Sequence, residues 1–190
     1  MKKICSLLVL CATVVFASCS KDDPVTEPVP EGITVTTYDA LLDALQTGGT
    51  SADAPTLITL GGNITIPAGG DYDTPPINGS GHFKIDGGGH TLAWEAGSYY
   101  FLGNANTDAD AVYIELTNIK LVQAPNSYSA VVGVCNGRIT LGGNVILDGN
   151  GNMPVIVVSD EKAALELGDG CELSYAAGSS GCAKVMEGAT

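Results

Sequence analysis

Short runs in which apolar and polar residues alternate recur along most of the chain. In Ile139–Asn150, two three-residue apolar runs, Ile139–Leu141 and Val145–Leu147, flank a glycine-asparagine corner. The alternation places the first and last residue of each run on one face of a short strand. Close variants of this stretch are found at Ile58–Ile66, Phe83–Leu92, Ile114–Leu121 and Leu165–Leu173.

The runs return at a nearly constant spacing. Aligning the last apolar residue of each first run gives spacings of 25, 31, 25 and 26 residues for Leu60, Ile85, Leu116, Leu141 and Leu167. A unit of this size cannot bury its own apolar face, so the period predicts a stacked repeat. The clearest repeat has three strand-like runs, which favours a right-handed parallel β-helix. An antiparallel β-sandwich is the alternative, but it predicts two-residue hairpin turns that are not evident.

One segment resembles a known family. Ile85–Leu92 is similar to the Ile-Asp-Gly-x-Gly-His-x-Leu element of the first coil in the pectate-lyase-like superfold, and Leu57–Thr190 as a whole resembles that superfold. We therefore expect an all-β chain with about five coils over residues 57–190. A strand and a helix over residues 33–56 should cap its amino end, with Thr36 and Asp39 as a capping box. Equivalent side chains should stack ~4.8 Å apart, including an asparagine ladder of Asn63, Asn118 and Asn144.

The amino end has the features of a secretory signal. Residues 1–18 hold Lys2 and Lys3, an apolar run, and small residues before Cys19. Phe16–Cys19 resembles the lipobox of bacterial lipoproteins, which implies cleavage before Cys19 and its acylation, including palmitate. An ordinary signal peptide with a chance cysteine is the alternative. Ser20–Asp23 resembles the export signal of Bacteroidota surface lipoproteins, which implies an outer-membrane anchor with the chain facing outward. Residues 19–32 form an acidic, proline-containing tether.

Charge and cysteine content narrow the range of functions. The formal net charge is −13, which argues against nucleic acid as a partner because its phosphates attract Lys and Arg. After the signal and Cys19, the cysteines are Cys135, Cys171 and Cys182. They show neither CxxC nor Cys/His spacing, so zinc is unsupported.

Candidate chemistry lies on the outward residues of the first strands, namely Thr59, Lys84, Glu115, Thr140 and Glu166. Glu115 and Glu166 should lie two coils apart, ~9–10 Å at the backbone, close to the ~6.5–9.5 Å of inverting glycosidases. A lyase needs a base and a Ca²⁺ site. Arg138, just before a first strand, is the candidate base. Asp108 and Asp110 are the candidate Ca²⁺ ligands.

Aromatic side chains gather in the second repeat. Trp94, Tyr99 and Tyr100 could stack on sugar rings, although alternation also favours core positions for some of these rings. The sequence therefore favours a non-catalytic surface lipoprotein, adhesin-like or glycan-binding, with a polysaccharide or host glycan as partner. The alternative is the amino-terminal part of a polysaccharide lyase or glycoside hydrolase. Val185–Thr190 aligns with Val134–Ile139, which leads us to expect a fragment of a longer solenoid.

Overall fold

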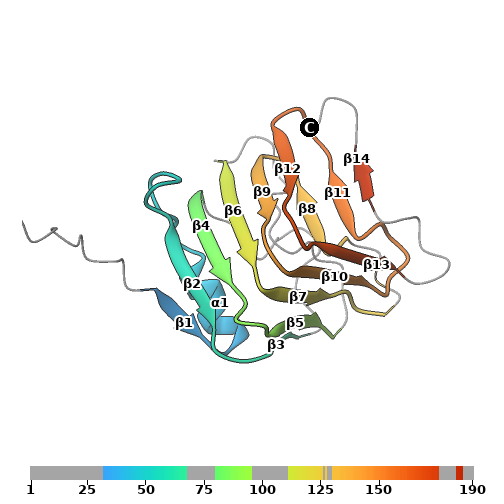
Figure 1. Cartoon of the computed structure of the whole chain (residues 1–190), viewed down its shortest axis with the longest axis horizontal. Coiled ribbons are helices and arrows are strands. Elements are labelled where there is room, and N and C mark those ends of the chain that lie inside the picture. The colour runs from blue at the N-terminus through green and yellow to red at the C-terminus, as the bar shows by residue number, and fades with distance from the viewer. Residues whose placement is uncertain are drawn as a thin grey trace, which may run out of the picture.

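The computed structural model describes residues 32–67, 80–95, 111–125, 127 and 130–175, together with the backbone of residues 183–185. These residues form a parallel β-solenoid of about four turns with one short helix near the amino end (Figure 1). The predicted all-β stacked repeat is confirmed. The solenoid has about four turns, where the sequence predicted about five coils.

Three parallel sheets run along the solenoid, and every pair of neighbouring strands in them is parallel. The first sheet contains, in spatial order, β1 (Ile33–Val35), β2 (Thr56–Leu60), β4 (Gly81–Asp86), β6 (Val112–Thr117), β9 (Gly137–Leu141) and β12 (Ala163–Leu167). The second contains β3 (Ile64–Ile66), β5 (Thr91–Trp94), β7 (Ile119–Val122), β10 (Val145–Gly149) and β13 (Glu172–Tyr175). The third contains β8 (Val132–Val134), β11 (Ile156–Val158) and β14 (Ala183–Val185).

The core consists of ladders of inward side chains from successive coils. Ile58, Ile85, Leu116 and Leu141 lie in register and are all at most 1% exposed. The predicted alignment of Leu60 with Ile85 is therefore wrong by two residues, because β2 pairs with β4 through Ile58 opposite Ile85 and Thr59 opposite Asp86. A shift of two residues keeps the same side chains inward, so the alternation alone could not exclude it.

The helix α1 (Tyr38–Ala44) lies at the amino end of the solenoid, where it packs against β1 and β3 (Figure 1). Its N-cap is Thr37, whose Oγ1 accepts a hydrogen bond from the Ala40 amide at 3.2 Å. The predicted capping box of Thr36 and Asp39 is therefore wrong: the N-cap lies one residue later, and the residue three positions after it is Ala40, whose side chain cannot return the bond. Leu41 and Ala44 are the buried face of the helix. Within the described part of the chain, no helix is long and apolar enough to cross a membrane.

Candidate functional site

The outward face of the first sheet carries two rows of side chains that run across the coils. The ring row consists of His82, Tyr113 and Arg138, which occupy equivalent positions on β4, β6 and β9. Two residues further along the same strands, the charged row consists of Lys84, Glu115, Thr140 and Glu166, from β4, β6, β9 and β12. Because side chains at i and i+2 of a strand point to the same side, both rows face outward.

The charged row contains four of the five outward residues that the sequence predicted. Thr59 is the exception, because it pairs with Asp86, and Leu57 takes the place opposite Lys84. Arg138 lies within β9, whereas the sequence placed it before the strand. The first correction shifts β2 by two residues relative to β4, and the second begins β9 at Gly137, before Arg138.

Two flat rings form the apolar part of this face. The His82 and Tyr113 rings stack with their centroids 4.4 Å apart and their planes 7° apart, and Tyr113 is 39% exposed. The backbone of His82 exchanges two hydrogen bonds with Gly49, at 2.8 and 3.0 Å. This pairing holds the loop of residues 48–55 beside the rings. The ring pair was not predicted from the sequence, although a spacing of 31 residues separates both His82 from Tyr113 and Ile85 from Leu116.

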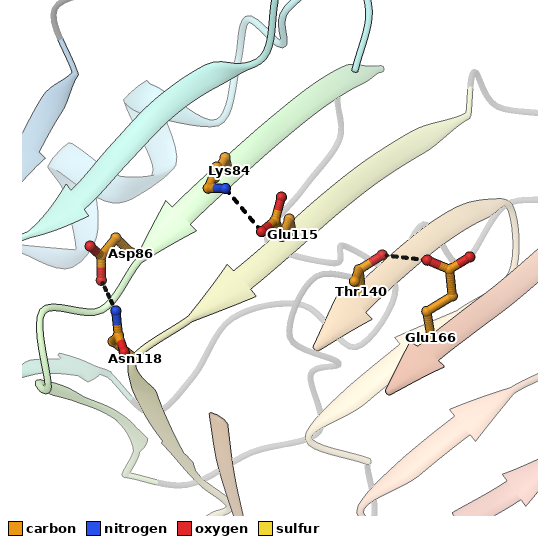
Figure 2. Close-up of polar contacts among 6 residues, drawn as sticks. All are labelled: Lys84, Asp86, Glu115, Asn118, Thr140 and Glu166. Atoms are coloured by element: carbon orange, nitrogen blue, oxygen red, sulfur yellow. Dashed lines mark hydrogen bonds and ion pairs between the residues drawn. The ribbon is translucent and has the colours of Figure 1, made fainter. Parts of the chain in front are cut away.

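Ion pairs and a hydroxyl link the neighbouring coils of this face (Figure 2). Lys84 Nζ donates to Glu115 Oε1 at 3.0 Å, and Thr140 Oγ1 donates to Glu166 Oε2 at 3.1 Å. Arg138 Nη1 lies 3.1 Å from Glu166 Oε1. The four charged side chains are 41–53% exposed. Solvent screening at this exposure limits each pair to ~0–1 kcal/mol, so their main effect is to orient the side chains.

Together, the two rows border an open groove of about 310 Å³. Ala52 and Pro55, from the loop of residues 48–55, also line it. The volume is at the lower end of the range typical of small-molecule sites, ~300–1,000 Å³. An open cleft with a ring pair and several fixed polar groups can hold a ligand that has both apolar and hydroxyl surfaces.

A hydrogen-bonded line of side chains, here called the corner ladder, joins three successive coils at the corner between the first and second sheets. Asn144 Nδ2 donates to Asn118 Oδ1 at 3.0 Å, and Asn118 Nδ2 donates to Asp86 Oδ1 at 3.2 Å. Asn118 and Asn144 have φ values of 49° and 58°, a left-handed conformation that asparagine tolerates well. Figure 2 shows Asp86 and Asn118 meeting at the ends of their strands.

Asn63 is not a member of the corner ladder, although the sequence predicted that it would be. Its Oδ1 accepts a hydrogen bond from the Thr91 amide at 2.9 Å, and the carboxylate of Asp86 is the ladder member next to Asn118. The amide of Gly88 also donates to Asp86 Oδ1, at 2.9 Å. The sequence signal for Asp86 was its position directly before Gly87–Gly89, a tight corner that a carboxylate can brace.

The second sheet carries a further polar line on its outward side. Lys120 Nζ lies 2.7 Å from Asp148 Oδ2, and Ser174 Oγ donates to Asp148 Oδ1 at 3.1 Å. The hydrogen bond from Lys120 lowers the pKa of Asp148, and the bond from Ser174 and the charge of Lys120 act in the same direction. Partial burial of the carboxyl opposes them. This line bridges three coils.

Of the predicted glycan-contacting residues, Trp94 is buried, at 6% exposure, so its assignment as a glycan contact was wrong. Trp94 pairs with Ile66 and follows the buried Leu92 by two residues, so it faces inward. Tyr99 and Tyr100 lie outside the described residues, as do Cys19 and the candidate Ca²⁺ ligands Asp108 and Asp110. Within the described part, no group of three or more His, Cys, Asp or Glu side chains is placed to hold a metal ion.

The three candidate catalytic residues all line the groove. Arg138 and Glu166 contact each other, whereas Glu115 contacts Lys84. Each carboxylate therefore already has a cationic partner from a neighbouring strand.

The described cysteines play structural parts in the coil. Cys135 and Cys171 are free thiols. The Cys135 sulfur lies 2.8 Å from Ser159 Oγ, and the Cys171 sulfur donates to the carbonyl of Leu141 at 3.1 Å. Both contacts join neighbouring coils, and Cys182 lies outside the described residues.

Comparisons with known proteins return no significant match. Neither a protein-family model, nor a curated protein, nor a solved structure matches the chain. Evidence for function therefore comes from the chemistry of the groove and from the amino-terminal sequence.

Proposed function

We propose that this protein is a lipid-anchored protein of the outer-membrane surface whose β-solenoid carries a glycan-binding groove. The observation that carries the proposal is the groove on the first sheet, where the stacked rings of His82 and Tyr113 lie beside a row of exposed polar side chains. The pectate-lyase-like resemblance of Ile85–Leu92 supports the same view.

The amino-terminal sequence supports the anchor. Lys2 and Lys3 precede an apolar run too short to span a bilayer, and small residues lead to Cys19. Several acyl chains on Cys19 would anchor the protein firmly, since each buried CH₂ contributes ~0.8 kcal/mol. The acidic Ser20–Asp23 segment supports export to the outer surface. The tether then leads into β1, at one end of the first sheet, which would leave the groove free along the side of the solenoid.

The groove suits a carbohydrate because its two kinds of surface match those of a sugar. A sugar ring has apolar C–H faces and hydroxyl edges, and a partly exposed Tyr113 ring offers an apolar face to the former. Lys84, Glu115 and Thr140 offer both donors and acceptors to the hydroxyls. Such convergent polar groups beside an apolar surface are typical of ligand sites.

Binding is better supported than catalysis. A lyase or glycoside hydrolase would need a free acid or base in the groove, whereas Glu115 and Glu166 are each held by a cation at about 3 Å. Their role as links between coils accounts for their positions. The alternative, an enzyme with its catalytic groups on further coils, is tested by polysaccharide cleavage assays on the purified protein.

Three measurements test the proposal. In cells that process lipoproteins, palmitate labelling should be lost in Cys19→Ala. Protease added to intact cells should remove the protein that carries the native Cys19. On an array of immobilised polysaccharides, the full-length protein in detergent should bind at least one glycan. Labelling that survives in Cys19→Ala would refute the anchor, and an array without any bound glycan would refute the groove's function.

A further inference from the structure

Resting on the proposed glycan-binding function, we propose that the groove selects neutral glycans and rejects uronate-containing ones. The inference comes from the charge balance of the side chains that line it. Two cations, Lys84 and Arg138, face two carboxylates, Glu115 and Glu166. The formal charges of these four side chains cancel.

An acidic glycan finds no free cation in this arrangement. Lys84 Nζ is 3.0 Å from Glu115, and Arg138 Nη1 is 3.1 Å from Glu166. A uronate that used the remaining N–H groups of either cation would lie beside the paired Glu115 or Glu166 carboxylate, and the two like charges would repel each other. The formal charge of −13 on the whole chain adds repulsion at a distance.

A neutral glycan can use the same side chains without separating them. Glu115 contacts Lys84 through Oε1, and its Oε2 has no protein partner among the described residues, so it can accept from a sugar hydroxyl. Thr140 Oγ1 donates to Glu166 and keeps lone pairs that can accept a hydrogen bond. Lys84 has further N–H groups that can donate. Each ion pair thus offers a preoriented donor and acceptor to the hydroxyl groups of a sugar.

The test compares oligosaccharides of one length and different charge. Full-length protein in detergent micelles is titrated with cello-, manno- and xylohexaose as neutral probes and with hexagalacturonate as the acidic probe. We expect a neutral hexaose to bind and hexagalacturonate to fail. Binding should change less than about twofold between about 50 and 500 mM salt, since a neutral ligand forms no ion pair that salt can screen.

Charge-releasing variants make the test sharper. Glu115→Gln with Glu166→Gln leaves Lys84 and Arg138 without their carboxylates, so this double variant should gain affinity for hexagalacturonate by at least tenfold. The control is Glu172→Gln, which removes the same kind of charge from an exposed site on β13, outside the groove. It should gain no affinity for this probe.

The outcomes separate the two proposals. Unmodified protein that binds hexagalacturonate more tightly than every neutral hexaose would overturn neutral selectivity while leaving glycan binding intact. A double variant that gains nothing over Glu172→Gln would also overturn the charge argument. Protein that binds none of the four oligosaccharides and no glycan on the array would overturn the proposed function and the neutral selectivity together.

Discussion

The hydrogen bonds of the corner ladder lead us to a quantitative prediction for the free energy of unfolding. Asn118 is its central member, because it accepts from Asn144 at 3.0 Å and donates to Asp86 at 3.2 Å. Its φ of 49° also places it in the left-handed region. The change Asn118→Ala removes both hydrogen bonds and puts a residue with a Cβ, but without a local polar partner, into that conformation.

The expected loss can be worked from these two effects. A side-chain hydrogen bond contributes ~0.5–1.5 kcal/mol net, so two account for ~1–3 kcal/mol. Left-handed backbone costs an ordinary residue ~1–2 kcal/mol, of which asparagine avoids a part. We therefore expect Asn118→Ala to lower the free energy of unfolding by ~2–4 kcal/mol. Asn118→Gly loses the same bonds without the steric cost, so it should be ~1 kcal/mol less harmful than the alanine variant.

Urea titration followed by circular dichroism in the far ultraviolet measures both variants against the unmodified chain. Asn63→Ala is the matched control, since it loses a single hydrogen bond to the Thr91 amide and should cost ~0.5–1.5 kcal/mol. Stability of Asn118→Ala within ~0.5 kcal/mol of the unmodified chain would contradict the role assigned to the corner ladder. A glycine variant less stable than the alanine variant would contradict the steric cost assigned to the left-handed backbone at Asn118.

Two further predictions concern a close backbone contact and a titrating carboxylate. Gly137 has φ of 103°, and a Cβ there would meet the Val112 carbonyl oxygen, so Gly137→Ala should lose ~2–5 kcal/mol in urea titration. Gly143→Ala should be nearly neutral, because nothing lies within 4 Å of its Cβ position; equal losses would contradict this. The lowered pKa of Asp148 means that its pair with Lys120 stabilises the fold above the ordinary value of 3.8. Asp148→Asn should therefore lower the free energy of unfolding by at most ~1 kcal/mol at pH 7. The difference in stability between the variant and the unmodified chain should vanish as the pH falls below 3.8 and through the lowered pKa. A difference that grows in acid would contradict this prediction.

The repeat itself could be predicted from the sequence because the core depends on alternation. Ile85, Leu116 and Leu141 are in register and fully buried, as their spacing predicted. The register of the first coil could not be settled in this way, since Ile58 and Leu60 are both buried and differ by one full period of the strand. The pairing of β2 with β4 places Ile58 opposite Ile85, and that contact joins residues 27 apart.

The candidate site was harder to predict because it depends on exposed side chains. Glu115 and Glu166 were placed on the right face, but their partners Lys84 and Arg138 depend on the register and on side-chain reach. Trp94 was placed on the wrong side of its strand. Its aromatic side chain suggested a sugar contact, whereas strand alternation places it in the core. To predict the ring row, His82 has to be aligned with Tyr113. The 31-residue spacing allows this alignment once the coils are in register.

The measurement that tests the groove most directly is calorimetric titration of a neutral hexaose into full-length protein and two tyrosine variants. Tyr113→Ala removes the exposed ring of the groove, whereas Tyr175→Ala removes a ring that is 53% exposed on β13. Equal urea midpoints will establish that all three proteins are folded. We expect Tyr113→Ala to bind at least about tenfold more weakly, as for the loss of an aromatic anchor, and Tyr175→Ala to bind like the unmodified protein. Binding by Tyr113→Ala within about twofold of the unmodified protein would contradict the assignment of the groove.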